Sequence, residues 1–221
     1  MIKAVIFDMD GLLINSEPVW YKARIELFKP HGIEWTWEDQ KNTMGVSTQA
    51  WVDYMTGKAN GKLNSEEILN GVIEKMAGFY KRGEIDIMPG AEEAVQFVNG
   101  KYKLGVASGS YKKLLYAALE SRGWDKYLDE ILSSDDLQRG KPSPDIYLEV
   151  SKRLGVYPEE AIVLEDSKDG MKAGIAAGTN VIAVPSEGVT IPEELKDKIA
   201  AVLPSLHEFP AALEEINNSG K

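Results

Sequence analysis

The chain begins MIKAVIFDMDG at residues 1–11, an apolar run that ends in two carboxylates and a glycine. A short and nearly continuous apolar run, here residues 2–7, predicts a strand buried on both faces, as in a parallel sheet covered by helices. Residues two apart on a strand face the same side, so Asp8 and Asp10 should project together from its carboxyl end. Open parallel sheets bind their ligands at that end. The opening stretch therefore predicts an α/β fold and the place of its functional site.

Four further apolar runs follow along the chain, at residues 104–107, 130–132, 161–164 and 180–184. Helix-like stretches accompany them at residues 91–98, 112–121, 145–154 and 170–177. Within the first of these stretches, Ala94, Val95 and Val98 recur at the three-and-four spacing of a buried stripe. Short buried strands that alternate with amphipathic helices predict a Rossmann-like parallel sheet with helices on both faces.

The alternation is interrupted once, between residue 15 and about residue 87, where no convincing strand occurs. We expect residues 15–87 to form a helical cap domain, inserted into a catalytic core made of residues 1–14 and 88–221. Ser65, followed by two acidic residues, is expected to cap a helix. Four of the five tryptophans lie in the insert, and their rings either fill its core or, for one ring, contact substrate: Trp20, Trp35, Trp37 and Trp51.

Composition and charge narrow the function classes. The chain has 221 residues, 43% of them hydrophobic and 27% charged, as in an ordinary globular protein. With 25 basic and 35 acidic residues, the net charge of −10 argues against a surface for duplex nucleic acid. The absence of Cys excludes disulfides and thiolate chemistry. No signal peptide or membrane span is recognisable, so we expect a cytoplasmic and monomeric enzyme.

A second acidic group follows the run at residues 161–164, in the same position relative to its strand as Asp8. It consists of Glu165, Asp166 and Asp169. Carboxylates from two neighbouring strand ends should converge, and hard oxygen ligands of this kind suit Mg²⁺. Asp169 could instead cap the helix expected to begin near Gly170.

Groups suited to an anion follow two other segments. Ser108 and Gly109 lie at a strand end that leads into a helix, where backbone N–H groups bind anions, and Gly11 lets the backbone approach a ligand closely. Lys141 supplies a cation. Two unit charges 4 Å apart interact by about 4 kcal/mol at an effective dielectric of 20. A phosphate beside the acidic residues would meet several such repulsions, more than one lysine cancels, so a divalent cation is expected.

Four segments in this order resemble the haloacid dehalogenase superfamily of phosphohydrolases: DMDGLLINSE at 8–17, SGS at 108–110, KP at 141–142 and EDS at 165–167. The match covers essentially the whole chain. The insert resembles the helical cap of the subgroup that contains β-phosphoglucomutase and sugar-phosphate phosphatases.

The resemblance implies a role for each matched residue. Asp8 would be the nucleophile and Asp10 the general acid and base. Ser108 and Lys141 would bind the phosphoryl group. Mg²⁺ would be held by Asp8, the Asp10 carbonyl and Asp166. Either Glu165 or Asp169 would assist.

The chain departs from the family pattern in the cap region. Asn15 stands where the family commonly has Asp, which bears on cap motion more than on chemistry. The mutase branch has a cap His, where this chain offers Glu17 to Trp20. It also has a Lys and an Arg around a Gly-Val-Ser turn that hold a second phosphate, whereas here Met44 and Thr48 flank the turn. These differences favour a phosphatase. Candidate substrate contacts in the cap are Glu17, Trp20, Met44, Val46 and Trp51.

The sequence thus predicts a Mg²⁺-dependent phosphatase that acts on small phosphomonoesters, such as sugar or sugar-alcohol phosphates, through an aspartyl phosphate on Asp8. Two alternatives stay open: a phosphotransferase like β-phosphoglucomutase, and a catalytically silent protein that senses phosphate.

Overall fold

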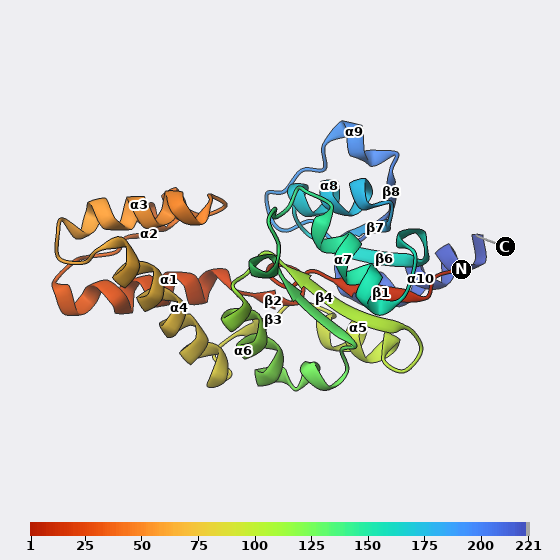
Figure 1. The fold of residues 1–221 in the computed structure, drawn as a ribbon, viewed down its shortest axis with the longest axis horizontal. Helices are drawn as coiled ribbons and strands as arrows, with labels where there is room; N and C mark the ends of the chain where they lie inside the picture. The colour runs from red at the N-terminus through yellow and green to blue at the C-terminus, as the bar shows by residue number, and fades with distance from the viewer. Residues whose placement is uncertain (220–221) are drawn as a thin grey trace. The chain divides into compact units, whose positions relative to one another are not determined.

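The computed structural model describes residues 1–219, so the last two residues of the predicted core lie outside it (Figure 1). Contacts divide the chain into two compact units. One comprises Met1–Asn15 and the chain from Asp86 onward, and the other is Ser16–Ile85. We call them the core unit and the helical unit.

The core unit is built on a six-stranded sheet with the order β5-β4-β1-β6-β7-β8, in which all neighbouring strands are parallel. The strands are β1 (Ala4–Phe7), β4 (Lys103–Ser108), β5 (Glu130–Ser133), β6 (Ala161–Glu165), β7 (Asn180–Ala183) and β8 (Ile199–Val202). The predicted parallel α/β fold is confirmed. The edge strand β8 was not predicted, because only alternate residues of its short segment are partly buried and it lacks a continuous apolar run.

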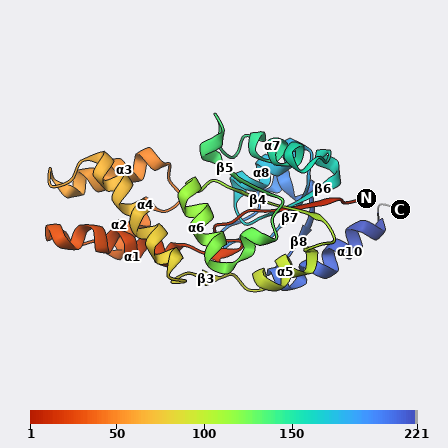
Figure 2. The same ribbon diagram turned by 60° about the horizontal axis from the view of Figure 1, so that its bottom comes forward.

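Helices cover both faces of this sheet (Figure 2). Ala4 and Ile6 of β1 lie in one apolar cluster with residues of α7 (Asp145–Leu154) and α8 (Lys168–Ala177). Phe7 points to the opposite face, where its ring meets Phe209 of α10 edge-on at 5.8 Å. The remaining helices of the core unit are α5 (Ala91–Val98), α6 (Lys112–Arg122), α9 (Glu193–Lys196) and α10 (Phe209–Ser219).

Two helix starts differ from the sequence-based expectation. Helix α8 begins at Lys168, two residues before the expected position, because the Ser167 hydroxyl accepts a hydrogen bond from the Gly170 amide at 3.1 Å and caps the helix. In the helical unit, Asn64 caps α4 (Ser65–Lys81) in place of Ser65. The Asn64 side chain accepts from the Glu67 amide at 2.9 Å, and Glu67 accepts from the Asn64 amide at 2.8 Å.

Two short antiparallel strands, β2 (Ile14–Asn15) and β3 (Asp86–Ile87), lie at the limits of the region in which no strand was expected. They belong to the core unit. A tight loop connects β1 to β2, and the Met9 carbonyl accepts hydrogen bonds from the amides of Leu13 and Ile14 within it. This loop places Asp8 and Asp10 immediately beyond the carboxyl end of β1.

The helical unit consists of α1 (Glu17–Phe28), α2 (Trp37–Thr43), α3 (Thr48–Ala59) and α4. Two of its four tryptophans fill its interior: Trp35 packs against Phe28 at 5.5 Å, and Trp51 against Trp20 at 5.9 Å. Trp37 is 51% exposed, so its ring does not fill the interior, in contrast to the expectation from the sequence.

Short 3₁₀ helices occur at Lys29–His31, Trp124–Lys126, Ser134–Asp136, Pro158–Glu160 and Leu206–Glu208. Within the described part of the chain, no helix has both the length and the apolar character needed to cross a membrane.

Candidate active site

The site lies where three adjacent strands of the core unit end. Phe7 pairs with Val106 of β4 on one side and with Leu164 of β6 on the other, so Asp8, the next residue, lies between the ends of those strands. Ser108 ends β4 and Glu165 ends β6. Parallel pairing therefore brings together side chains that are up to 157 positions apart in sequence (165 minus 8).

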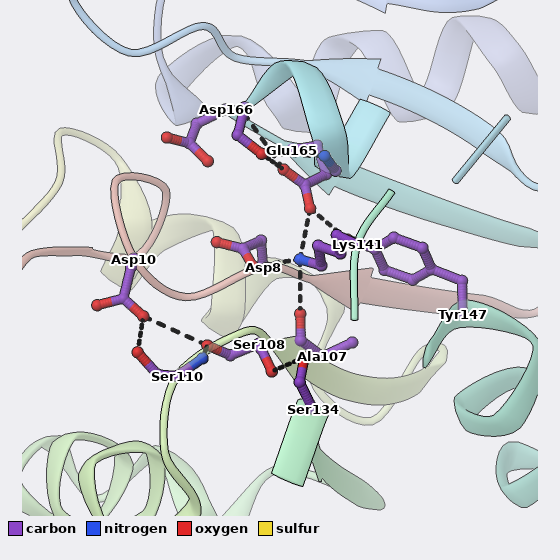
Figure 3. Close-up of polar contacts among 12 residues, drawn as sticks. Asp8, Asp10, Ala107, Ser108, Ser110, Ser134, Lys141, Tyr147, Glu165 and Asp166 are labelled. Atoms are coloured by element: carbon purple, nitrogen blue, oxygen red, sulfur yellow. Dashed lines mark hydrogen bonds and ion pairs between the residues drawn. The ribbon is translucent and has the colours of Figure 1, made fainter. Parts of the chain in front are cut away.

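A lysine whose side chain is largely buried connects the carboxylates of Asp8 and Glu165 (Figure 3). The Lys141 Nζ atom lies 2.5 Å from Asp8 Oδ1, 2.6 Å from Glu165 Oε1 and 3.1 Å from the Ala107 carbonyl oxygen. Only 11% of the Lys141 side chain is exposed. An ammonium group has three protons to donate, and these contacts use all three.

Burial and charge shift the pKa values of these groups. Burial raises the pKa of Asp8 well above its ordinary value, the charges of Glu165 and Asp166 raise it further, and Lys141 opposes the shift. Burial by itself would lower the pKa of Lys141, but the charges of Asp8 and Glu165 raise it above its ordinary range. Burial also raises the pKa of Asp166 to about 6, against a hydrogen bond from Ser186 that lowers it. The cluster is thus short of positive charge.

These residues fit a divalent metal ion. Asp8, Glu165 and Asp166 each offer a ligand atom, and the three atoms lie within 4.8 Å of one another. Three carboxylates against one ammonium leave an excess of negative charge in a buried place, which a hard cation would offset. Asp169, in contrast, is exposed in the first turn of α8 and lies outside this group of described acidic residues.

The Glu165 carboxylate is already surrounded by hydrogen-bond donors. Its Oε1 atom accepts from Lys141 and, at 2.5 Å, from the Tyr147 hydroxyl. Its Oε2 atom accepts from the Ser167 amide at 3.3 Å and from the Ser167 hydroxyl at 3.0 Å. A Cβ atom at Gly170 would lie 1.9 Å from the Glu165 carboxyl carbon. Glu165 therefore holds Lys141 in place, and Asp8 and Asp166 are the more available metal ligands.

Gly11 allows the loop after β1 to approach Asp166. Its φ angle is +82°, and a Cβ atom there would lie 2.3 Å from Asp166 Oδ2 and 2.8 Å from the Ser186 hydroxyl oxygen. The Ser186 hydroxyl donates to Asp166 Oδ2. The Gly11 amide donates to the Ile14 carbonyl at 2.8 Å. Gly11 thus contributes close approach in this structure, not a free N–H group.

The Asp10 side chain points to Ser108 at the end of β4 and to Ser110 just beyond it (Figure 3). Its Oδ2 atom accepts hydrogen bonds from the hydroxyls of Ser110 at 2.6 Å and Ser108 at 3.3 Å. The Ser110 amide donates to the Ser108 hydroxyl oxygen at 2.9 Å. Gly109, between the two serines, is exposed.

The helical unit contains the other candidate residues. Trp20 is half-buried, Trp51 is 5% exposed, and Met44 and Val46 are 38% and 43% exposed. Glu17 is exposed and accepts a hydrogen bond from Gln40 at 3.2 Å. The structure therefore brings Trp20 and Trp51 together and leaves Met44 and Val46 on the surface.

Four residues that contact the candidate residues were not singled out from the sequence. Tyr147, Ser186 and Ser110 contact the acidic residues of the core unit, and Arg24 contacts tryptophans of the helical unit. Arg24 is buried in the helical unit, with its guanidinium carbon 5.1 Å from the centre of the Trp20 ring and 5.5 Å from that of Trp51. Burial lowers its pKa to about 10. Hydroxyl residues and a single Arg carry no periodic signal, and only Ser110 lay within a recognised motif.

Comparison with known proteins gives a consistent result. A family model described as "Haloacid dehalogenase-like hydrolase" matches residues 5–184. The chain is 30% identical over 216 residues to "Phosphorylated carbohydrates phosphatase" of Thermotoga maritima, covering 97% of this chain and 100% of that protein. It is 33% identical over 189 residues to "Hexitol phosphatase B" of Escherichia coli, covering 84% of each.

Solved structures agree with these sequence matches. CbbY from Rhodobacter sphaeroides in complex with phosphate superposes with a TM-score of 0.81 at 25% identity, over 97% of this chain and 100% of that one. β-Phosphoglucomutase from Clostridium difficile superposes with a TM-score of 0.71 at 25% identity, over 99% of each chain.

Proposed function

The chain belongs to the haloacid dehalogenase-like hydrolase family as a phosphatase, and on this premise we propose that it hydrolyses sugar or sugar-alcohol phosphates through an aspartyl phosphate on Asp8. The observation that carries the mechanism is the contact of the largely buried Lys141 ammonium with Asp8 and Glu165. This contact favours the ionised carboxylate that a nucleophile requires. The raised pKa of Lys141 keeps that ammonium charged.

The first step is an in-line displacement. A carboxylate oxygen of Asp8 attacks phosphorus, and the bond between phosphorus and the sugar oxygen breaks. The proton carried by Asp10 passes to the departing oxygen, so the alcohol leaves neutral. Lys141 and Ser108 offset charge on the phosphoryl oxygens.

The second step restores the enzyme. Asp10, now a carboxylate, takes a proton from a water molecule whose oxygen attacks phosphorus. The bond between phosphorus and Asp8 breaks, and inorganic phosphate leaves. When bound, Mg²⁺ would be held by Asp8, Asp166 and the Asp10 carbonyl, and would supply positive charge opposite the phosphoryl oxygens.

Two relatives support the substrate class, since their names specify phosphorylated carbohydrates and hexitols. We assign substrate selection to the helical insert, predicted as residues 15–87. Met44 and Thr48 flank the Gly-Val-Ser turn without a cation of their own, which favours water over a second sugar phosphate as the phosphoryl acceptor.

A panel of phosphomonoesters with Mg²⁺ tests this proposal. It should include hexose 6-phosphates, glucitol 6-phosphate, mannitol 1-phosphate and β-glucose 1-phosphate, with inorganic phosphate and isomerised sugar phosphate measured in parallel. We expect stoichiometric phosphate release from at least one sugar or sugar-alcohol phosphate. Conversion of β-glucose 1-phosphate to the 6-phosphate without phosphate release would establish the mutase alternative.

A further inference from the structure

The Ser110 hydroxyl lies in the site but takes no part in the two displacement steps. Ser110 follows β4 by two residues, and its hydroxyl donates to Asp10 Oδ2 at 2.6 Å. The Ser108 hydroxyl is 3.3 Å from the same oxygen, so the Ser110 hydrogen bond is the shorter of the two. We propose that Ser110 is a positioning residue that holds the Asp10 carboxylate in place for proton transfer. This inference rests on the proposed function, in which Asp10 is the general acid and base.

Competition for the Ser108 proton makes Ser110 the more important partner. A serine hydroxyl has one proton to donate. In the proposed mechanism Ser108 binds a phosphoryl oxygen, so its proton is withdrawn from Asp10 when substrate is present. Ser110 then remains as the hydroxyl that restrains the Asp10 carboxylate during the reaction.

Ser110 is itself held firmly from two neighbouring strand ends. Its amide donates to the Ser108 hydroxyl oxygen at 2.9 Å, and its carbonyl accepts from the Ser133 hydroxyl at 2.6 Å. Ser133 is 1% exposed, ends β5, and lies opposite Ser108 in the parallel register. Its hydroxyl oxygen also accepts from the Asp135 amide at 3.1 Å. A residue anchored in this way can orient another side chain.

The two carboxylate oxygens of Asp10 consequently differ. Oδ2 accepts the serine hydroxyls, whereas Oδ1 is buried and has no hydrogen-bond partner among residues 1–219. In the proposed mechanism we therefore assign proton transfer to Oδ1, whose position the hydrogen bonds to Oδ2 fix. In the first step this proton moves from Oδ1 to the sugar oxygen as the phosphorus–oxygen bond breaks, and in the second step Oδ1 receives a proton from the attacking water. With Ser110 absent, the carboxylate can rotate and this orientation is lost.

The dependence of the rate on the leaving group tests the proposal. An alkoxide needs a proton as it departs, whereas the acetate released from acetyl phosphate does not. The value of kcat/KM includes the steps up to departure of this group and excludes hydrolysis of the phosphoenzyme. We would measure kcat/KM for acetyl phosphate and for the best alkyl phosphomonoester of the panel, with glucitol 6-phosphate tried first.

We expect Ser110→Ala to lower kcat/KM for the alkyl substrate by about 10- to 100-fold, and for acetyl phosphate by less than about 3-fold. Ser110→Thr keeps the hydroxyl and should recover most of the loss. The inhibition constant of inorganic phosphate should stay within about 2-fold, because Ser110 is not proposed to bind the phosphoryl group. Ser121→Ala, which removes a hydroxyl that donates to the Ala118 carbonyl of its own helix, is the control and should leave both substrates unaffected.

An equal loss for both substrates, no loss for either, or a phosphate inhibition constant that rises with the loss would overturn this role for Ser110. Failure of the proposed function itself would appear differently, as turnover that survives Asp8→Asn. Melting temperatures from circular dichroism would verify that each variant is folded.

Discussion

Gly170, in the first turn of α8, is where we expect alanine to have an effect opposite to its usual one. Replacing a helical glycine by alanine in an open position stabilises a protein by roughly 0.5–1 kcal/mol. At residue 170, however, the added Cβ atom would lie 1.9 Å from the Glu165 carboxyl carbon and 2.0 Å from its Oε2 atom. A Cβ atom is fixed to the backbone, so the Glu165 carboxylate has to move.

The cost follows from the contacts that Glu165 would lose. Its carboxylate accepts hydrogen bonds from Lys141, Tyr147 and Ser167. Each hydrogen bond to a charged group contributes about 1.5–3 kcal/mol, and bonds that share one carboxylate are not additive. Breaking a buried ion pair costs about 3–5 kcal/mol, and we expect Gly170→Ala to lower the free energy of unfolding by that amount. Phosphatase activity should fall at least about 10-fold, because Lys141 loses its second anchor.

Guanidinium chloride unfolding followed by circular dichroism measures the change, with activity on the best panel substrate measured beside it. Gly57→Ala in α3 is the matched control, since nothing lies within 4 Å of its Cβ position, and it should be neutral or slightly stabilising. Unfolding free energies that shift in the same direction for both variants, or full activity in Gly170→Ala, would refute the reasoning.

Three further outcomes are expected. Asp8→Asn should lower turnover by at least about 10⁴-fold while its melting temperature stays within a few degrees of wild type, and phosphate release by this variant would exclude Asp8 as nucleophile. Mg²⁺ at 100 times its dissociation constant should stabilise the folded protein by about 2.7 kcal/mol and so raise its melting temperature. Chelation should abolish this rise, and the Asp166→Asn variant should not show it. In the helical unit, burial by itself would raise the pKa of Asp39. Hydrogen bonds from Lys58, Thr36 and Tyr54 outweigh this effect and lower the pKa of Asp39 to about 2. Its stabilising effect is thus present above about pH 4 and lost as the pH falls from about 4 to about 2. Unfolding can be followed by tryptophan fluorescence, because this unit contains four of the five tryptophans. The stability of the wild type should fall over this pH range, and that of Asp39→Asn should depend less on pH. At pH 7 the variant should be less stable than the wild type by about 1–2 kcal/mol.

Local patterns were sufficient to predict the buried strands and the residues that follow them. A strand buried on both faces requires a continuous apolar run, and a parallel sheet requires its ligand-binding residues at the carboxyl ends. For this reason β1, β4 and β6 were recognisable, and so were Asp8, Ser108 and Asp166 beside them. The edge strand β8 could not be predicted in this way, because Ala200 and Val202 are exposed and an edge strand does not require a continuous apolar run.

By itself the amino-acid sequence determined the fold class, the helical insert and the set of acidic and cationic groups available for chemistry, because apolar periodicity and motif spacing are local properties of the chain. The tertiary structure decided which partner each group has. It placed Lys141 between Asp8 and Glu165, left Asp169 outside the acidic cluster, and turned Ser110 toward Asp10. Such contacts depend on strand register and on donor–acceptor distances that must be right within fractions of an ångström. Both are set only when distant segments pack together.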